Sequence, residues 1–268
     1  MTSLVDTHCH IHDSNYDFLI EDVLKQAQLN KIDAMICVGT DLKSSQEALD
    51  FCLKNPNCYA SLGLHPHLGV KPLTELKEMF EQLRQLSLDA QYKDKLVAIG
   101  ECGLDYFYHH DSEIKARQKQ IFQWQLNLAG ELNLPLIFHV RSAFEDFWSI
   151  YDDYKLPGSL HSFSDSLKQV KKGLTYDDLY FGLNGIMTFS QDKDQLLAAK
   201  SIPSSRLLLE TDAPYLTPKP FRGKMNKPHY LRQIANFLID FRNEEDQLFC
   251  RQTTKNAQTL FNIAIPTD

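Results

Sequence analysis

The feature that most constrains the fold is a regular alternation between short apolar runs and longer amphipathic segments. Eight runs rich in apolar and β-branched residues predict strands, at residues 4–7, 34–38, 59–64, 97–99, 136–138, 159–160, 179–182 and 207–209. The intervening segments carry apolar residues near helical period, for example at residues 19–29, 73–86 and 114–132. A strand followed by a helix, repeated eight times, predicts an α/β fold with a parallel (β/α)8 TIM barrel.

The length of the chain agrees with one such barrel. The chain has 268 residues, and a single barrel domain has about 250. The eighth predicted strand is followed by a proline-rich loop at residues 213–228 and by helical segments at 230–241 and 244–261. Since no shift in composition marks a linker, we predict one domain over residues 1–268.

Composition limits where the protein works and what it binds. The amino terminus has no basic segment before a long apolar stretch, and no apolar run approaches the roughly 18 residues of a membrane span. We therefore expect a soluble cytoplasmic protein with no membrane partner. The six cysteines form no CxxC pair and lie mostly in apolar segments, as reduced, packed thiols do. The net charge of −7 argues against a general coat for nucleic acid, so any recognition of phosphate must be local.

Polar residues recur where the predicted strands end, which is where barrels of this kind carry their chemistry. They follow the first, third, fourth, fifth, sixth and eighth strands, as His8 and His10, His65, Glu101, His139, His161 and Asp212. A chance scatter of ten histidines would not place five of them at such positions. We interpret the remaining histidines, at 12, 67, 109, 110 and 229, as surface or loop residues.

The histidine pair near the amino terminus has a chelating spacing. Alternate side chains of an extended strand share a face, so His8 and His10 point the same way and Cys9 points to the other side. Together with His139, His161 and two carboxylates they make a nitrogen and oxygen ligand set suited to two divalent ions, with Glu101 as the natural bridge. Paired ions activate water and stabilise a leaving oxygen, so phosphoester hydrolysis is the leading chemistry.

Short motifs throughout the chain, in a fixed order, indicate a family. They are DTHCH at residues 6–10, GLHP at 63–66, IGECGLD at 99–105, HVR at 139–141, HSFS at 161–164, GIMTF at 185–189, ETDAPYL at 210–216, RGKMNKP at 222–228 and TKNA at 254–257. In these motifs the chain resembles the TatD-type metal-dependent deoxyribonucleases, a branch of the amidohydrolase-like barrels. Each motif alone is weak, but the ordered set is highly specific.

The resemblance implies a monomeric barrel that hydrolyses DNA phosphodiesters, often as a 3′ to 5′ exonuclease, with single strands or 3′ ends as its substrate. It implies two divalent ions per chain, Mg²⁺ or Mn²⁺ in function, with Zn²⁺ as an alternative. One ion would be held by His8, His10, Glu101 and Asp212, and the other by Glu101, His139 and His161. Glu101 and Asp212 would be catalytic, and His65 and Arg222 would contact substrate phosphate.

Several residues near these motifs have two interpretations. Glu210 lies two residues before Asp212, where it either orients a ligand or water or pairs with a nearby cation. We interpret Asp105 as a structural partner for a backbone group or an arginine. Residues 106–108, Tyr-Phe-Tyr, either stack unpaired bases or pack an active-site loop. Ser162 and Ser190 depart from the family pattern, which commonly has Cys and a basic residue there, so contacts with substrate at the rim are expected to differ.

Two other functions remain open on the sequence alone. A similar two-metal barrel can attack a small amide, ester or lactone, since the fold does not fix the substrate. A barrel that has lost catalysis and serves as a binding scaffold is the third possibility, against which the intact ligand set argues. The loop from Pro218 to Pro228 carries Lys219, Arg222, Lys224 and Lys227 and no acidic residue. Hydrolysis of a small neutral substrate does not need this charge, which favours a nucleic acid.

Overall fold

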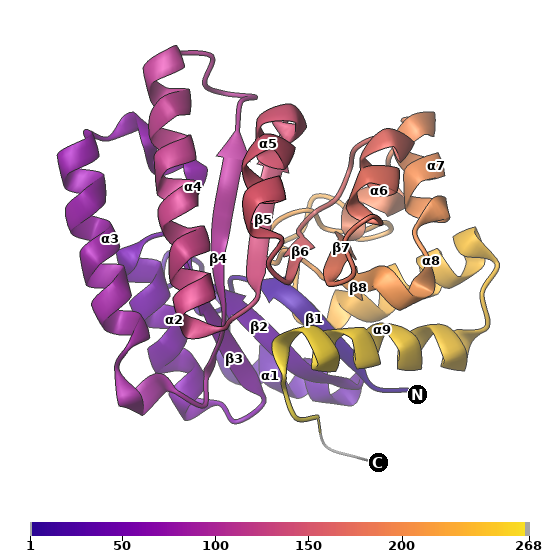
Figure 1. The fold of residues 1–268 in the computed structure, drawn as a ribbon. Helices are drawn as coiled ribbons and strands as arrows, with labels where there is room; N and C mark the ends of the chain where they lie inside the picture. The colour runs from indigo at the N-terminus through magenta and orange to yellow at the C-terminus, as the bar shows by residue number, and fades with distance from the viewer. Residues whose placement is uncertain (1, 266–268) are drawn as a thin grey trace. The chain divides into compact units, whose positions relative to one another are not determined.

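The computed structural model describes residues 2–265, which form eight strands and nine α-helices in alternation (Figure 1). These residues group in two compact units, which are described in turn. Unit 1 comprises the described residues up to Cys37 and from Ser162 onward, and unit 2 comprises Val38–His161.

Unit 1 contains the first and last strands of the chain. Its strands are β1 (Leu4–Cys9), β2 (Ile32–Val38, whose last residue begins unit 2), β7 (Leu179–Leu183) and β8 (Leu207–Leu209). Its α-helices are α1 (Ile20–Leu29), α6 (Leu167–Gly173), α7 (Lys193–Ser201), α8 (Leu231–Arg242) and α9 (Asp246–Phe261). Three short 3-10 helices are η3 (Gly185–Thr188), η4 (Ser204–Arg206) and η5 (Pro228–Tyr230).

The strands of unit 1 are parallel, and β8 lies beside β1. Val5 is opposite Ala34 in the pairing of β1 with β2, and β7 pairs with β8 in the same direction. Just after β8, the Asp212 N–H donates to the carbonyl of His8 at 2.8 Å, and the His10 N–H donates to that of Ala213 at 2.7 Å. Contact between the first and last strands is what closes a (β/α)8 barrel.

Unit 2 contains the four central strands. They are β3 (Cys58–Leu62), β4 (Leu96–Asp105), β5 (Leu136–Arg141) and β6 (Gly158–Leu160). The α-helices are α2 (Leu42–Lys54), α3 (Leu73–Ser87), α4 (Ser112–Leu132) and α5 (Phe144–Tyr154), and the 3-10 helices are η1 (Pro66–Val70) and η2 (Ala90–Tyr92). The four strands are parallel and adjacent in chain order, and α4 runs beside β4 (Figure 1).

Aromatic side chains fill the core of unit 2 between β5 and its two flanking helices. Phe122 of α4 stacks on Phe147 of α5 with ring centroids 5.6 Å apart, and Phe147 stacks on Tyr151 at 5.4 Å. Phe138 of β5 meets Phe147 edge to face at 5.2 Å. Rings in these arrangements add about 0.5 to 1.5 kcal/mol per pair beyond the area they bury. This packing holds β5, and so the end of the strand that carries His139, in a fixed position.

All eight predicted strands are confirmed, but β1, β4 and β5 each extend two or more residues past the predicted end. β4 continues to Asp105 and β5 to Arg141, so Glu101 and His139 lie within strands rather than after them. The continuation of β4 depends on Gly100 and Gly103, whose φ angles of +150° and +139° are rarely adopted by other residues. A Cβ at Gly103 would collide with the backbone of His139, its partner on β5. Glycine therefore allows the close approach of the two strands.

Other expectations from the sequence agree with the structure. The six cysteines are all buried and free of disulfides. The five predicted helices begin and end within two residues of observed ones. Asp111 caps α4, since its carboxylate accepts the N–H groups of Glu113 and Ile114. Within residues 2–265, the helices are all too short or too polar to cross a membrane.

Candidate metal centre

The histidine pair at the end of β1 has the predicted geometry. His8 and His10 are both buried, and their Nε2 atoms lie 3.2 Å apart. Cys9 points to the other side of the strand, where its thiol donates to the carbonyl of Ile36. The alternation of side chains along β1 therefore sets two imidazole nitrogens side by side.

Asp212 completes a group of three donor atoms in unit 1. Its Oδ1 lies 3.7 Å from Nε2 of His8 and 3.4 Å from Nε2 of His10. Donor atoms about 2.0 to 2.2 Å from a tetrahedral zinc ion stand roughly 3.3 to 3.6 Å from one another. The observed separations of 3.2 to 3.7 Å fit a shared divalent ion. This triad joins the end of β1 to the residues that follow β8.

Local backbone and a buried carboxylate hold Asp212 in place. Asp212 has a φ of +58°, a left-handed conformation that is uncommon for an aspartate outside functional sites and turns. The carboxylate of Asp6 accepts the N–H of Thr211 at 2.8 Å and its hydroxyl at 2.6 Å, which ties the end of β8 to β1. Burial raises the pKa of Asp6 to about 7, although the bonds from Thr211 act to lower it.

In unit 2 the carboxylate of Glu101 is approached by three histidines. Its Oε1 lies 2.9 Å from Nδ1 of His139, 3.6 Å from Nε2 of His65 and 3.9 Å from Nε2 of His161. The donor atoms of His65, Glu101 and His139 all lie within 4.8 Å of one another. The histidines come from β5 and from the ends of β3 and β6, and Glu101 comes from β4. Parallel strands thus bring together residues 36 to 60 positions from Glu101.

The other side of the His139 ring is held by Asp105. The Nε2 atom of His139 lies 3.0 Å from Oδ2 of Asp105, and Nε2 of His67 lies 3.1 Å from the same oxygen. Burial acts to lower the pKa of His139, but its hydrogen bonds to Asp105 and Glu101 outweigh burial and raise it. Burial likewise acts to raise the pKa of Asp105, but hydrogen bonds from the two histidines hold it well below its usual range.

Asp105 has the structural role that the sequence indicated, and His67 has a partner that the sequence did not indicate. Asp105 accepts the N–H of Phe107 at 2.9 Å, and its side-chain partners are two histidines rather than an arginine. His67, interpreted as a loop residue, shares the Asp105 carboxylate with a predicted metal ligand. Its place beside His65 in the chain was the available signal, but the contact with Asp105 forms only in the folded unit, where the ends of different strands meet.

The protonation of His65 can be read from its hydrogen bonds. Its Nδ1 accepts the N–H of His67 at 3.1 Å, as the cap of η1. Burial keeps the pKa of His65 well below its usual value despite the nearby Glu101 carboxylate, so the ring is neutral. Since Nδ1 is an acceptor, the single proton lies on Nε2, which faces Glu101. A protonated nitrogen donates to an anion and does not ligate a metal.

Glu210 bonds to neutral groups of unit 1. Its Oε1 accepts the N–H of Ser162 at 2.6 Å and lies 3.4 Å from the side-chain amide of Asn184. Asn184 also donates to the hydroxyl of Ser162 at 2.8 Å. Glu210 therefore fixes the backbone at the residue that directly follows His161 in the chain. The two roles that the sequence left open for Glu210, orientation of a ligand or water and pairing with a cation, stay predictions.

Arg222 lies in the loop that follows β8. Its Nη1 donates to the carbonyl of Thr217 at 2.9 Å, and its guanidinium lies 3.9 Å from the centre of the Phe189 ring. The loop is anchored by Asn226, whose buried amide donates to the carbonyls of Thr211 and Tyr215. In the part of the chain that the structure describes, no carboxylate pairs with Arg222, and its side chain is exposed.

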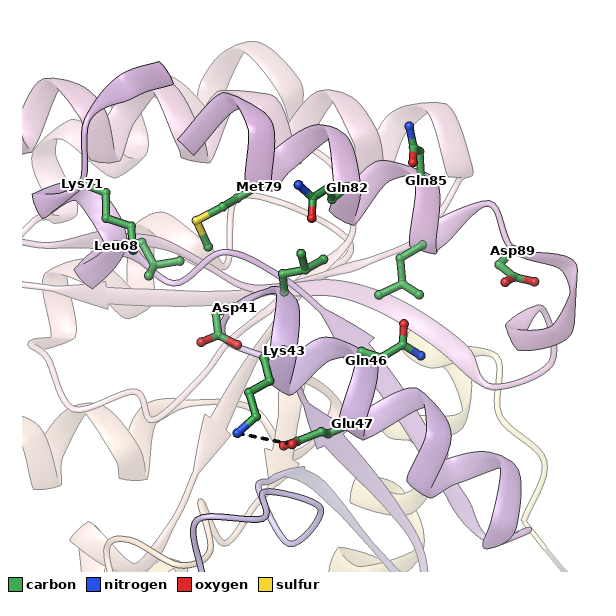
Figure 2. A pocket seen from close by; sticks show the side chains of 12 residues that line it. Asp41, Lys43, Gln46, Glu47, Leu68, Lys71, Met79, Gln82, Gln85 and Asp89 are labelled. Atoms are coloured by element: carbon green, nitrogen blue, oxygen red, sulfur yellow. Dashed lines mark ion pairs between the residues drawn. The ribbon is translucent and has the colours of Figure 1, made fainter. Parts of the chain in front are cut away.

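A separate groove of about 800 Å³ lies between α2 and α3 in unit 2 (Figure 2). Its polar side chains include Lys43 and Glu47, which form an exposed ion pair at 3.5 Å (Figure 2). None of the predicted ligands lines it. Exposed pairs of this kind contribute little to stability or binding, and the groove offers no cluster of metal-ligating side chains.

The fold and the donor atoms together define the class of protein. Eight parallel strands alternate with helices, and histidines and carboxylates suited to divalent ions gather at the carboxyl ends of the strands. The solved structure of YjjV, a TatD homologue from Escherichia coli K12, has the same fold, with a TM-score of 0.89, 29% identity, and coverage of 97% of this chain and 98% of that one. The predicted (β/α)8 barrel is confirmed. The protein is a metal-dependent hydrolase on this barrel.

The family follows from the sequence as well. The model for TatD related DNase matches residues 5–262, so the chain belongs to this family. The metal-dependent hydrolase YabD of Bacillus subtilis, named as uncharacterized, is 35% identical over 97% of this chain and 99% of its own length. The 3′-5′ ssDNA/RNA exonuclease TatD of Salmonella typhimurium is 32% identical over 91% of this chain and 93% of its own length.

Proposed function

We propose that the protein hydrolyses phosphodiester bonds of nucleic acids, as a 3′ to 5′ exonuclease acting on single strands or 3′ ends of DNA. The observation that carries the proposal is the compact donor set around Asp212 in unit 1 and around Glu101 in unit 2. Support comes from membership of the TatD-related family and from the Salmonella relative named as an exonuclease of single-stranded DNA and RNA. The cationic loop with Arg222 suits a polyanionic substrate better than a small neutral one.

We assign six residues to two divalent ions, Mg²⁺ or Mn²⁺ in function, with Zn²⁺ as the alternative. His8, His10, Glu101 and Asp212 would hold one ion, and Glu101, His139 and His161 the other. Imidazole nitrogens and carboxylate oxygens are ligands that these ions accept. Bound ions of this kind lower the pKa of water and act as Lewis acids towards phosphoryl oxygen.

The side chains of the protein have distinct roles in this proposal. The Nε2–H of His65 donates to a phosphate oxygen, since its other nitrogen is already occupied by the His67 N–H. Arg222 binds a phosphate through the N–H groups that do not bond Thr217. Asp212 accepts the proton of the attacking water, and Glu101 would be a ligand of both ions. Residues 1–268 would act as one domain and as a monomer in the cytoplasm, where the six buried thiols stay reduced.

The test is hydrolysis of matched substrates by the purified protein with Mg²⁺, Mn²⁺ or Zn²⁺. Oligonucleotides labelled at the 5′ end, single-stranded and double-stranded, in DNA and RNA, would be compared with a small neutral ester. We expect a ladder that shortens from the 3′ end, lost on addition of EDTA and in His139→Ala. His110→Ala is the matched control, because His110 is exposed and has no predicted role. Turnover of the ester without any turnover of nucleic acid would contradict the proposal.

A further inference from the structure

Two exposed aromatic rings follow β4 in unit 2, next to the cluster around Glu101. Phe107 is 50% exposed and Tyr108 is 58% exposed. Their rings meet edge to face at 4.8 Å. The third aromatic residue of this segment, Tyr106, is buried, and its hydroxyl donates to Asp146 at 2.8 Å. Tyr106 therefore packs the loop, and the two rings after it remain accessible.

Arg141 at the end of β5 completes this surface. Its guanidinium lies 3.9 Å from the centre of the Phe107 ring and 5.0 Å from that of Tyr108. Arg141 is exposed, and no carboxylate pairs with it among residues 2–265. An arginine stacked on a ring keeps the edge of its guanidinium free to donate to an anion. We call Phe107, Tyr108 and Arg141 the aromatic platform.

The backbone under the platform is fixed. The N–H of Phe107 donates to Oδ1 of Asp105 at 2.9 Å, and the N–H of Tyr106 donates to the carbonyl of Arg141 at 2.9 Å. These bonds tie the loop to the ends of both strands. A ligand on the platform would thus meet rings that are already held in place, so less ordering is needed on binding.

Contacts connect the platform to the candidate metal centre. The Tyr108 ring meets the His67 ring at 5.6 Å between centroids, and Nε2 of His67 lies 3.1 Å from Asp105. Asp105 in turn lies 3.0 Å from His139, which faces Glu101 at 2.9 Å. The platform is therefore at the rim of the histidine cluster in unit 2.

We propose that the aromatic platform binds a single-stranded nucleic acid, with an unpaired base stacked on Phe107 or Tyr108 and a phosphate held by Arg141. This rests on the proposed function and names how the strand is held beside the site of hydrolysis. Exposed ring faces accept any base, and a free guanidinium edge beside them suits a phosphate. A nucleic acid strand presents both groups at once, and its unpaired bases are accessible only when it is single-stranded.

The test measures binding in EDTA, so that hydrolysis does not interfere. A single-stranded oligonucleotide with 2-aminopurine at successive positions from the 3′ end reports stacking through loss of fluorescence. We expect quenching at one or two positions, and affinity that falls roughly 5- to 150-fold in Phe107→Ala or Tyr108→Ala. Tyr108→Phe should bind like the wild type, because it keeps the ring. Unchanged thermal midpoints would show that the variants fold.

Two controls separate stacking from charge and from fold. In Tyr176→Ala we expect no change, since Tyr176 has a cation over its ring, Lys172 at 5.0 Å, but precedes the amino end of β7. An abasic nucleotide at the quenched position should weaken binding by the wild type and add nothing in Phe107→Ala or Tyr108→Ala. If the abasic nucleotide weakens binding equally in the wild type and in both alanine variants, the inference is overturned.

Failure of this inference and failure of the proposed function give different results. If the wild type cleaves single strands but both alanine variants bind them as tightly as it does, the platform is refuted and the function stands. If the wild type neither binds nor cleaves any strand with any of the three metals, the proposed function is itself refuted, and the platform with it.

Discussion

The carboxylate of Asp105 lies 3.0 Å from Nε2 of His139, while the other ring nitrogen of His139 faces Glu101 at 2.9 Å. Because Asp105 accepts a hydrogen bond from the Nε2–H of His139, the lone pair of the neutral ring is at Nδ1, on the side of Glu101. The carboxylate of Asp105 thus selects the tautomer of His139 that can ligate an ion. Partners of this kind commonly fix the orientation of metal-bound histidines.

We expect Asp105→Asn to weaken metal binding without unfolding the protein. The amide oxygen can keep the bond from the Phe107 N–H, but the amide NH₂ would face Nε2 and donate to it. The His139 proton would then move to Nδ1 and block the ligand position. The expected loss in affinity is about 10- to 100-fold, the range for such outer partners, measured by calorimetric titration with Mn²⁺ or Zn²⁺.

His67→Gln is the matched control, because His67 shares the Asp105 oxygen but is not a proposed ligand. It should bind metal nearly as well as the wild type and melt at a similar temperature. If Asp105→Asn also binds metal as tightly as the wild type, Asp105 does not set the tautomer of His139.

Removal of Glu101 should be more severe than removal of any single histidine. Its Oε1 is approached by His139, His65 and His161, and the proposal makes it the bridge between two ions. In Glu101→Ala we expect loss of both ions. Activity should fall by more than about 100-fold, which is the upper range for loss of a residue that only orients a metal ligand. His8→Ala should retain part of the metal. Metal content by mass spectrometry decides the point, and full turnover by Glu101→Ala would refute a shared bridge.

Metal affinity should rise with pH across the neutral range. Two carboxylates raise the pKa of His139 above its usual value, which is about 6.5, so the ring keeps its second proton to a higher pH than a free histidine. An ion must displace this proton. Affinity should therefore fall about tenfold per pH unit below the His139 pKa and level off above it.

Activity at limiting metal should show the same dependence, and excess metal should move the midpoint to lower pH. In Asp105→Asn one of the two carboxylates is lost, so the fall in affinity should begin at a lower pH. Affinities measured between pH 5 and 9 that do not change would show that no histidine proton competes with the ion.

The sequence predicts the bounds of a strand correctly where the apolar run and the strand end at the same residue. The run at residues 207–209 coincides with β8, because polar residues flank it on both sides. The end of β4 was missed because Gly100, Glu101 and Gly103 interrupt the apolar run, although hydrogen bonds to β5 carry the strand on to Asp105. Periodicity reports burial of side chains, whereas the length of a strand is set by its backbone partners.

The candidate ligands were predictable for a different reason. A parallel barrel places strand ends together, so residues of the right chemistry at those ends had to be near one another. Their partners were not predictable in this way. Asp105 and His139 are 34 residues apart, and only the register of β4 and β5 brings the two side chains into contact. The same holds for Asp6 and Thr211, which are separated by 205 residues.

Arg222 provides the sharpest test of substrate. Its guanidinium is stacked on Phe189 and donates to the Thr217 carbonyl, which leaves further N–H groups for an anion. We expect Arg222→Ala to weaken binding of a DNA oligonucleotide by about 1.5 to 3 kcal/mol, the range for a hydrogen bond to a charged group, with metal content unchanged. Arg222→Lys should recover only part, because an ammonium lacks the planar fork that matches two phosphate oxygens.

Salt and a second substrate separate a phosphate contact from a structural role. Loss of one contact should make the dependence of binding on salt shallower by roughly 0.7 in logarithmic slope for a single strand. Turnover of a small neutral ester, if the wild type has any, should be the same in Arg222→Ala, because that substrate has no phosphate to bind. Equal losses on DNA and on the ester would mean that Arg222 only supports its loop through Thr217 and Phe189. A loss confined to DNA would identify Arg222 as a contact to the phosphate backbone.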